Sequence, residues 1–369
     1  MNFQKFHLLI LVLSTHLTVY CQVACSDLKQ LIPADRKVYM IGEVHLDQEM
    51  PIQENVKMIK KITEVEDSIR DHLVKYCAVN HFMLELPNCY GYPVREYMAT
   101  GDTGWIESLK LNPYYYARLL GLRKLNEKYG GLRITCVDVN FPKDANRTIF
   151  ALLTLTFYDH YSVVYSPPYN TVTAIPPSAD LNVALQIMRI DTVNITENMR
   201  TYFIELMKLA LLGDEAADPF YQLLIKTKAD QKLLLALEKF YGDGWWEVNT
   251  VMDSYLFGFK YKSITGGMLS DREPQYYKLV SDLMNLFKYD VYCMQFGDAH
   301  LYPDAQNNMV RKRIMDNYKY QPYCLHLIPQ TFAFRLQEIN KPDKPYDFNF
   351  ADKFCLYSAG ESDAQVLVK

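Results

Sequence analysis

The sequence predicts an α/β fold, in which helices flank a central and mostly parallel β-sheet. Short apolar runs of strand length alternate with longer segments of helical periodicity, and this alternation is typical of a parallel sheet with covering helices. Several of the apolar runs end in titratable side chains, which would place them at the edge where open α/β sheets form pockets. A helical block over about 146–258 interrupts the alternation and indicates an insertion that forms a lid or a subdomain.

The first part of the chain alternates between strands and helices up to about residue 138. The helical region 51–76 carries apolar residues at three-residue steps. The helix over 114–129 follows a proline and precedes Gly130 and Gly131, which are residues typical of helix starts and ends. The predicted strands of this part lie over 38–41, 81–86 and 132–138.

The second part contains the insertion and the return to the sheet. The insertion has helical blocks over 148–160, 196–212, 219–241 and 245–256. A helix that contains Arg272 follows it. The remaining predicted elements are a strand over 291–296, a helix over 305–318, a strand over 323–328 and an edge strand near Phe354. We therefore expect one α/β domain over 26–369, with one helical insertion.

Two strand-end elements share the spacing of a glycine and a histidine. Glu43 and His45 directly follow the first predicted strand, and the spacing from Gly42 to His45 returns from Gly297 to His300. Because the carboxyl ends of parallel strands meet at one edge of a sheet, we expect these elements to form two walls of one site.

Glu85 and Arg272 are charged side chains at positions where a purely structural role would favour other residues. Glu85 lies at the tail of an apolar run, and burying an unpaired carboxylate is costly, so it needs a partner or a place at the rim of the sheet. Arg272 lies at the start of a predicted helix, where a cation opposes the helix dipole. It is expected either to clamp an anion or a carboxylate in the site or to pair with Glu273 at the surface.

The N-terminus has the pattern of a secretory signal peptide over 1–24. A weakly basic start precedes a short apolar block over 8–13 and a processing region, and the block is too short for a comfortable membrane span. Residues 23–25 also form a partial lipoprotein motif, although Gln22 replaces its usual leucine. We therefore expect an exported protein that is secreted, periplasmic or a cell-surface lipoprotein. A lipid on Cys25 would be its only contact with a membrane.

Charge and cysteine usage exclude other classes. The formal net charge is −4 and the sequence has no basic stripe, so nucleic acid is not an expected partner. The cysteines beyond Cys25 form no C-x-x-C motif, which argues against a structural zinc site. Cys136 and Cys293 lie in predicted core strands, where thiols act as small hydrophobes. In an exported protein two disulfides could form, one between Cys77 and Cys89 and one between Cys324 and Cys355.

Five short motifs occur in an order that is typical of one superfamily. They are Gly42-Glu43-Val44-His45, the strand-end Glu85, the strand that ends at Asp138, Arg272-Glu273 and Gly297-Asp298-Ala299-His300. With these motifs the chain resembles the erythromycin esterase-like superfamily, which also includes the ChaN haem-binding lipoproteins and the TraB/TIKI hydrolases. The resemblance extends from Val38 to Ile328 without the helical insertion.

The resemblance implies a role for each matched position. His45 resembles the first essential histidine of the esterase branch, and Glu43 resembles the acid before it. Glu85, Arg272 and His300 resemble the strand-end glutamate, the helix arginine and the second histidine. In the TIKI branch two such histidines and a glutamate are associated with a divalent metal, which implies His45, Glu85 and His300 as metal ligands.

The sequence also departs from this pattern. Leu46-Asp47-Gln48-Glu49 stands where the esterases commonly carry a small Gly/Ser-rich run, and the second histidine motif is closer to the TraB/TIKI form. The substrate class therefore does not transfer from the resemblance.

The preferred hypothesis is an exported hydrolase that acts on an ester or amide in a small-molecule or peptide substrate. His45 would act as the general base on water, with its tautomer fixed by Glu43 or Glu85. Arg272 and His300 would stabilise the developing oxyanion. In a metal-dependent version, His45, Glu85 and His300 would hold a divalent metal and leave a position open for water.

A second hypothesis belongs to another class, a surface lipoprotein that binds haem or iron without catalysis. It requires a tyrosine or histidine at the rim of the site, for which the sequence offers Tyr90, Tyr92 and Tyr302. A third hypothesis is a retained fold without activity. The intact set of five site residues argues against it, because a decayed site has no reason to keep them all. These residues are Glu43, His45, Glu85, Arg272 and His300.

Overall fold

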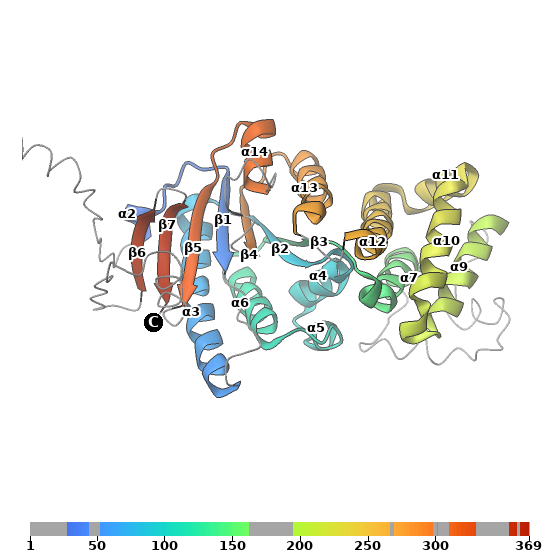
Figure 1. The fold of residues 1–369 in the computed structure, drawn as a ribbon, viewed down its shortest axis with the longest axis horizontal. Coiled ribbons are helices and arrows are strands. Elements are labelled where there is room, and N and C mark those ends of the chain that lie inside the picture. The colour runs from blue at the N-terminus through green and yellow to red at the C-terminus, as the bar shows by residue number, and fades with distance from the viewer. Residues whose placement is uncertain are drawn as a thin grey trace, which may run out of the picture.

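The centre of the molecule is a seven-stranded sheet in the order β3-β2-β4-β1-β5-β7-β6 (Figure 1). The computed structural model describes residues 28–43, 52–161, 195–265, 269–297, 301, 310–329, 354–359 and 362–368. Neighbouring strands are parallel except for β6, which is antiparallel to β7. The predicted α/β class is therefore confirmed. The strands are β1 (Val38–Glu43), β2 (His81–Pro87), β3 (Arg133–Asp138), β4 (Tyr292–Gly297), β5 (Tyr323–Pro329), β6 (Phe354–Ala359) and β7 (Ser362–Val368).

Both faces of the central strands are buried, which explains why these strands are continuous apolar runs. In β1, Tyr39 and Ile41 belong to one hydrophobic core, and Val38 and Met40 belong to a second core. This alternation follows from the two-residue repeat of a strand. Both faces of a parallel sheet are covered because its crossover helices lie on both sides.

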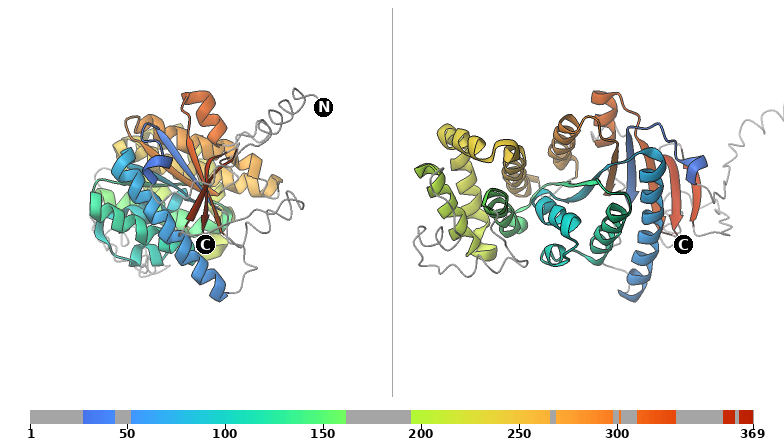
Figure 2. Two further views of the ribbon diagram at one scale, coloured as in Figure 1. Left: turned by 90° about the vertical axis from the view of Figure 1, so that its left-hand side faces the viewer. Right: turned by 180° about the vertical axis from the view of Figure 1, so that it is seen from behind.

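Helices cover the two faces of the sheet (Figures 1 and 2). Side chains of α3 (Ile52–Cys77) and α6 (Pro113–Tyr129) pack in the first core, and those of α13 (Leu269–Leu286) and α14 (Val310–Tyr318) pack in the second. The predicted ends of α6 are confirmed: the Asn112 side chain accepts a hydrogen bond from the Tyr115 N–H, and Gly130 follows the helix at φ 72°. The shorter helices are α2 (Leu28–Leu31), α4 (Gly91–Thr100) and α5 (Gly104–Glu107).

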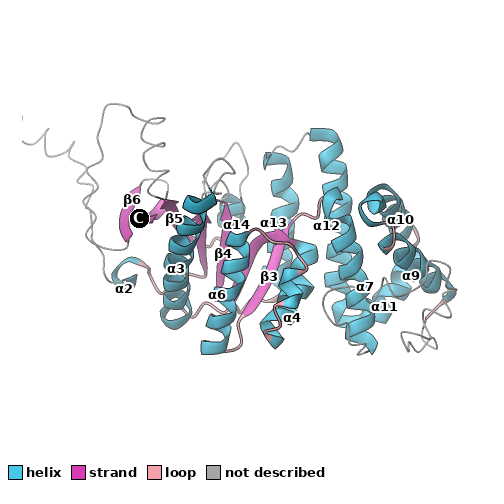
Figure 3. Cartoon of the chain, turned by 90° about the horizontal axis from the view of Figure 1, so that it is seen from below, coloured by secondary structure: helices cyan, strands magenta, loops and turns pink. Residues whose placement is uncertain are grey.

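A helical subdomain lies beyond β3, which is the edge strand on that side of the sheet (Figures 1 and 3). Its last helix, α12, returns to the sheet and packs on the chain that follows β3. There the Asn140 N–H donates to Ser254 Oγ at 3.0 Å. The helices of the subdomain are α7 (Ala145–Tyr161), α9 (Glu197–Ala210), α10 (Ala217–Ala229), α11 (Gln231–Tyr241) and α12 (Trp245–Thr265).

The helical block predicted over 219–241 is divided in two. The chain forms α10 and α11, separated at Asp230, which has an extended backbone. The Asp230 side chain accepts hydrogen bonds from the N–H groups of Lys232 and Leu233, both at 3.0 Å. Aspartate is a strong N-cap residue, so it starts a new helix where apolar periodicity alone would continue the old one.

The disulfide considered between Cys77 and Cys89 is wrong, because both residues are separate buried thiols. Cys77 precedes β2 and Cys89 follows it. Since the seven residues of β2 span roughly 23 Å, these thiols lie far beyond the reach of a disulfide. The predicted signal peptide, Cys25, residues 302–309 and the side chain of Cys355 lie outside the described residues. Within the described part of the chain, no helix has both the length and the apolar character needed to cross a bilayer.

A buried ionic network fastens α3 and α6 to the middle of the sheet. Glu66 of α3 accepts hydrogen bonds from Arg70 Nη1 and Arg118 Nη2, both at 3.1 Å. Arg70 also donates to Gln295 Oε1 of β4 at 2.9 Å and to Asp67 Oδ1 at 2.6 Å. The two guanidinium groups are paired with buried Glu66 and half-exposed Asp67, and such pairing is the condition under which charges are tolerated in an interior.

Candidate active site

The carboxyl ends of four parallel strands lie side by side. Glu43 at the end of β1 is the register partner of Gly297 at the end of β4. Pro87 at the end of β2 is the register partner of Asp138 at the end of β3. Because β2 lies between β3 and β4, Glu85 near the end of β2 has the ends of both strands as neighbours.

Arg272 of α13 joins two of these strand ends through a pair of buried carboxylates. Its Nη2 donates to Glu85 Oε1 at 2.9 Å, and its Nη1 donates to Asp138 Oδ2 at 3.3 Å. Only 15%, 5% and 10% of the Arg272, Glu85 and Asp138 side chains are exposed. This carboxylate–arginine cluster, Glu85 with Asp138 and Arg272, therefore has weak solvent screening, and its charge pairs are stronger than surface pairs.

The second oxygen of Glu85 binds the main chain of β4. The Gly297 N–H donates to Glu85 Oε2 at 2.5 Å, and Oε1 is held by Arg272. Both partners are donors, so they favour the ionised carboxylate and fix its orientation. Asp138 is held in the same way by Arg272 and by the Val139 N–H, which donates to Asp138 Oδ1 at 2.7 Å.

The cluster keeps Arg272 charged and its aromatic neighbours neutral. Burial lowers the pKa of Arg272, but the charges of Asp138 and Glu85 outweigh burial and hold this pKa above its ordinary value. Tyr276, whose ring lies 5.8 Å from the guanidinium carbon, has its pKa raised by burial and then by both carboxylates. Burial and the same carboxylates raise the pKa of Tyr115 of α6. Within the cluster, one guanidinium is thus paired with two carboxylates.

The sequence-predicted site residues divide into two groups. The structure describes the side chains of Glu85 and Arg272 and brings them into one ion pair. Of Glu43 it describes the backbone at the end of β1, and its side chain, like His45 and His300, lies outside the described residues. In the sequence, His45 stands two residues after Glu43, and His300 stands three residues after Gly297.

Asp138 is the member of the cluster that sequence reasoning did not assign to the site. It ends its strand in the same way as Glu85 ends an apolar run, and this shared position is the signal that could have found it. What the sequence lacks is the register, which puts the end of β3 beside the end of β2.

Of the three residues expected to hold a metal, the described residues include only Glu85. They contain no group of three or more His, Cys, Asp or Glu side chains that could hold an ion, while His45 and His300 lie outside them. Both oxygens of Glu85 already accept from cationic or N–H donors. A divalent cation bound to this carboxylate would also be repelled by the guanidinium that lies 2.9 Å from it.

Two of the tyrosines considered as haem ligands are not at a rim. Tyr90 and Tyr92 are 5% and 1% exposed, and the Tyr90 hydroxyl accepts a hydrogen bond from Arg147 Nη1 at 2.6 Å. The expectation that these residues are exposed is wrong, because the segment after β2 turns inward and packs on α7. Tyr302 lies outside the described residues.

Fold and site together define an α/β protein with a carboxylate–arginine cluster at the carboxyl ends of its parallel strands. The sequence matches no protein-family profile and no curated protein sequence. Among solved structures it is similar to a mutant of the erythromycin esterase EreC in its open conformation, at 12% identity and TM-score 0.43, covering 82% of this chain and 72% of the other.

Two further solved structures show likenesses of the same kind. A protein from Bacillus cereus is 11% identical at TM-score 0.43, covering 82% of this chain and 68% of the other. A succinoglycan biosynthesis protein is 10% identical at TM-score 0.38, covering 77% of this chain and 71% of the other. All of these are distant likenesses of fold.

Proposed function

We propose that the chain is an exported hydrolase that activates water for attack on an ester or amide. The observation that carries this proposal is the carboxylate–arginine cluster. Glu85, Asp138 and Arg272 are charged, shielded from solvent and fixed by hydrogen bonds at one edge of the sheet. Charges held in this way at the carboxyl ends of parallel strands are typical of catalytic sites, because burying them serves stability poorly.

His45 would be the general base of this hydrolase. It follows the end of β1 by two residues, and the end of β1 pairs with Gly297, whose N–H binds Glu85. Carboxylates such as those of the cluster favour the imidazolium that forms when a nearby histidine takes a proton from water. His300, which follows Gly297, would donate a hydrogen bond to the developing oxyanion.

Arg272 would act as a positioning residue. Both of its terminal nitrogens are engaged by carboxylates, so it does not stand ready to bind an oxyanion, as the sequence alone suggested. It would instead keep Glu85 ionised and correctly oriented toward the histidines.

The proposal is tested by hydrolysis of p-nitrophenyl butyrate and of a capped peptide anilide. His45→Ala and His300→Ala should each abolish turnover while changing the free energy of unfolding by less than about 2 kcal/mol. Arg272→Lys should lower kcat more than it raises KM, since it disturbs the orientation of Glu85 without touching substrate. Full activity in either histidine variant, or unfolding of both, would contradict the proposal.

The metal-free form of this mechanism is the one we propose, since Glu85 is already bound by two donors. Its test is the metal content of the purified protein before and after dialysis against a chelator. Activity that survives chelation supports the metal-free form. Stoichiometric zinc or manganese whose removal abolishes turnover would replace it by the metal-dependent form, with His45, Glu85 and His300 as ligands.

A further inference from the structure

Tyr115 of α6 is a hydrogen-bond donor at the same edge of the sheet as the carboxylate–arginine cluster. It lies in the first turn of the helix, where its N–H donates to Asn112 Oδ1 at 2.9 Å. A short connection through Gly130 joins the end of α6 to the start of β3, so the helix runs antiparallel to this strand. The start of α6 therefore lies at the carboxyl end of the sheet (Figure 1).

Arg272 and Tyr115 come from opposite faces of the sheet. Side chains of α13 pack in the second core, whereas Tyr115 packs against the first. Burial and then the charges of Glu85 and Asp138 raise the pKa of Tyr115, and the charge of Arg272 opposes this shift without reversing it. Because the effect of a charge weakens with distance, these groups lie close to the phenol. Tyr115 is therefore a neighbour of the cluster that stays protonated at neutral pH.

The ring of Tyr115 is held by packing and not by its hydroxyl. The guanidinium carbon of Arg118 lies 5.2 Å from the ring centre, and the Tyr114 ring lies 5.8 Å away at 47°. Both neighbours are fixed by the fully buried Glu66, which accepts from Arg118 Nη2 at 3.1 Å and also from the Tyr114 hydroxyl. The ring therefore has a defined position before any ligand binds.

The Tyr115 hydroxyl is open to a ligand. In the described ranges of the chain no hydrogen bond engages it, and solvent reaches its oxygen at the tip of the half-buried side chain. The two terminal nitrogens of Arg272, in contrast, are both bound by carboxylates. An oxyanion that forms beside carboxylates requires hydrogen-bond donors, because nearby negative charges oppose it. The phenol of Tyr115 supplies an uncharged donor that is already in place.

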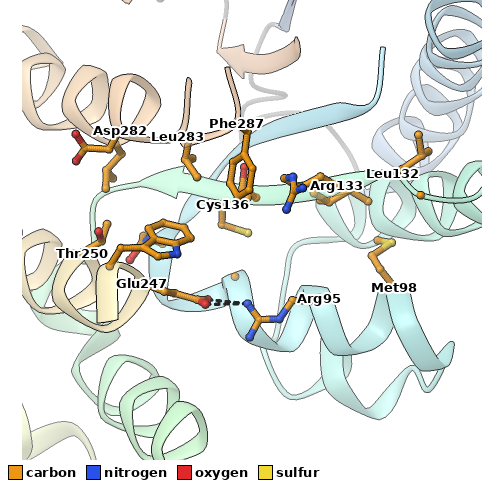
Figure 4. Close-up of a pocket in the computed structure, with 17 residues that line it drawn as sticks. Arg95, Met98, Leu132, Arg133, Cys136, Glu247, Thr250, Asp282, Leu283 and Phe287 are labelled. Carbon is orange, nitrogen blue, oxygen red and sulfur yellow. Dashed lines mark hydrogen bonds and ion pairs between the residues drawn. The ribbon is translucent and has the colours of Figure 1, made fainter. Parts of the chain in front are cut away.

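The cavity beside β3 is a separate feature of the molecule. It has a volume of about 340 Å³ and lies between side chains of α4, α12 and α13, among them Met98, Thr250 and Leu283 (Figure 4). Neither Tyr115 nor any residue of the cluster lines it. A substrate held by the Tyr115 hydroxyl would therefore lie at the strand ends and outside this cavity.

We propose that the Tyr115 hydroxyl donates a hydrogen bond to the carbonyl oxygen of the ester or amide and holds this oxygen as it becomes an oxyanion. The inference rests on the proposed hydrolase function. The attacking water loses a proton to His45 and its oxygen bonds to the carbonyl carbon, while the π-electron pair moves to the oxygen bound by Tyr115. When the carbonyl re-forms, the bond to the alcohol or amine breaks, and this leaving group takes the proton from His45. Tyr115 keeps its own proton throughout.

Tyr115→Phe removes the hydroxyl and retains the ring that packs on Arg118. The experiment measures hydrolysis of p-nitrophenyl butyrate by the full chain. The variant should lower kcat at least about tenfold and leave KM within about twofold, because the hydrogen bond strengthens in the transition state. Its thermal unfolding midpoint should equal that of the wild type, since the hydroxyl bonds to no described residue.

Tyr116→Phe is the matched control, since it removes the same group one position further along α6. Burial and the charge of Glu107 raise the pKa of Tyr116, so its hydroxyl lies beside Glu107 of α5 and not beside the cluster. Its kcat should stay within about twofold of the wild type. A second readout is inhibition by an alkyl trifluoromethyl ketone, whose hydrate resembles the tetrahedral intermediate. Tyr115→Phe should weaken this inhibition at least about tenfold, and Tyr116→Phe should leave it unchanged.

Two results would overturn this inference alone. Turnover by the wild type that Tyr115→Phe leaves at the same kcat would show that the hydroxyl does not bind the reacting oxygen. Equal losses of kcat or of inhibition in Tyr115→Phe and Tyr116→Phe would assign the effect to the packing of α6. Absence of turnover in the wild type, on this ester and on a capped peptide anilide, would instead overturn the proposed function, and this inference with it.

Discussion

The main-chain N–H of Gly297 donates to the carboxylate of Glu85 at 2.5 Å. This hydrogen bond fixes the end of β4 to a side chain of β2, and β4 is the strand from which the chain leads to His300. The same carboxylate binds Arg272 through its other oxygen. One side chain therefore holds two strand ends and a helix in position.

Glu85→Gln should destabilise the fold by about 3–5 kcal/mol, because an amide accepts through one oxygen and leaves either Gly297 N–H or the buried Arg272 without its acceptor. Urea denaturation measures the free energy of unfolding. Glu127→Gln is the control: Glu127 pairs with Arg123 at 3.0 Å but is 56% exposed, and it should change stability by less than about 1 kcal/mol. Equal effects of the two changes would show that the Glu85 contacts add no stability.

His81 should make the protein less stable in mild acid. Its ring is fully buried between Asp290, 3.1 Å from Nδ1, and Thr135, 2.9 Å from Nε2. Burial lowers the pKa of His81 to about 4, with the charge of Asp290 opposing this shift and that of Arg133 adding to it. The unfolded chain binds the proton below its ordinary pKa of 6.5, so stability is lost as the pH falls from about 6.5 to about 4.

The size of this effect is limited by the pKa shift to about 3 kcal/mol. Equilibrium urea unfolding at pH values between about 7 and 4 measures it for the wild type and for His81→Gln, which keeps a donor and an acceptor but does not titrate. The variant should lose the part of the pH dependence that corresponds to about one proton in this window. Identical pH profiles would assign the acid sensitivity to other groups.

The sequence was sufficient for most of the sheet because its strands are buried on both faces and therefore read as apolar runs. The successive residues Met40 and Ile41 face opposite cores. Such a strand therefore has apolar residues at every position and does not alternate apolar with polar residues. The same reasoning missed the break at Asp230, because a single capping side chain outweighs the periodicity of the apolar residues around it.

For the site, the sequence could indicate that Glu85 and Arg272 need partners, because unpaired buried charges are costly. It could not indicate that they are each other's partners, since they are 187 positions apart and meet only through the packing of α13 on the sheet. Asp138 was missed for the same reason.

Arg118→Met should cost about 3–5 kcal/mol, because it leaves the fully buried Glu66 with one cation in place of two. Lys208→Met is the surface control. Lys208 pairs with Glu205 at 2.9 Å, but the two side chains are 65% and 45% exposed, and the expected loss is below about 1 kcal/mol. Urea denaturation of both variants measures the difference.

Combining Arg118→Met with Glu66→Gln should restore part of the lost stability, because the uncompensated carboxylate is then removed. A double variant whose loss equals the sum of the two single losses would show that Arg118 and Glu66 do not interact energetically, in spite of the 3.1 Å contact between them.

Gly258→Ala should destabilise the protein although alanine is the better helix former. Gly258 lies within α12, and a Cβ there would lie 2.1 Å from the Asn140 carbonyl oxygen and 2.8 Å from Val139 Cγ1. The helix must therefore move away from the chain that follows β3. Overpacking of this kind costs roughly 1–3 kcal/mol, against a gain of at most about 1 kcal/mol in helix propensity.

The displacement should also reach the site, since Asn140 stands two residues after Asp138, which binds Arg272. Hydrogen exchange should accelerate at the Asn140 N–H, which donates to Ser254 Oγ of α12, because a loosened contact opens more often. Gly244→Ala is the control, since a Cβ at that position meets nothing within 4 Å. Wild-type values of both the unfolding free energy and this exchange rate in Gly258→Ala would contradict the prediction. They would show that the close approach at Gly258 does not hold α12 against the chain after β3.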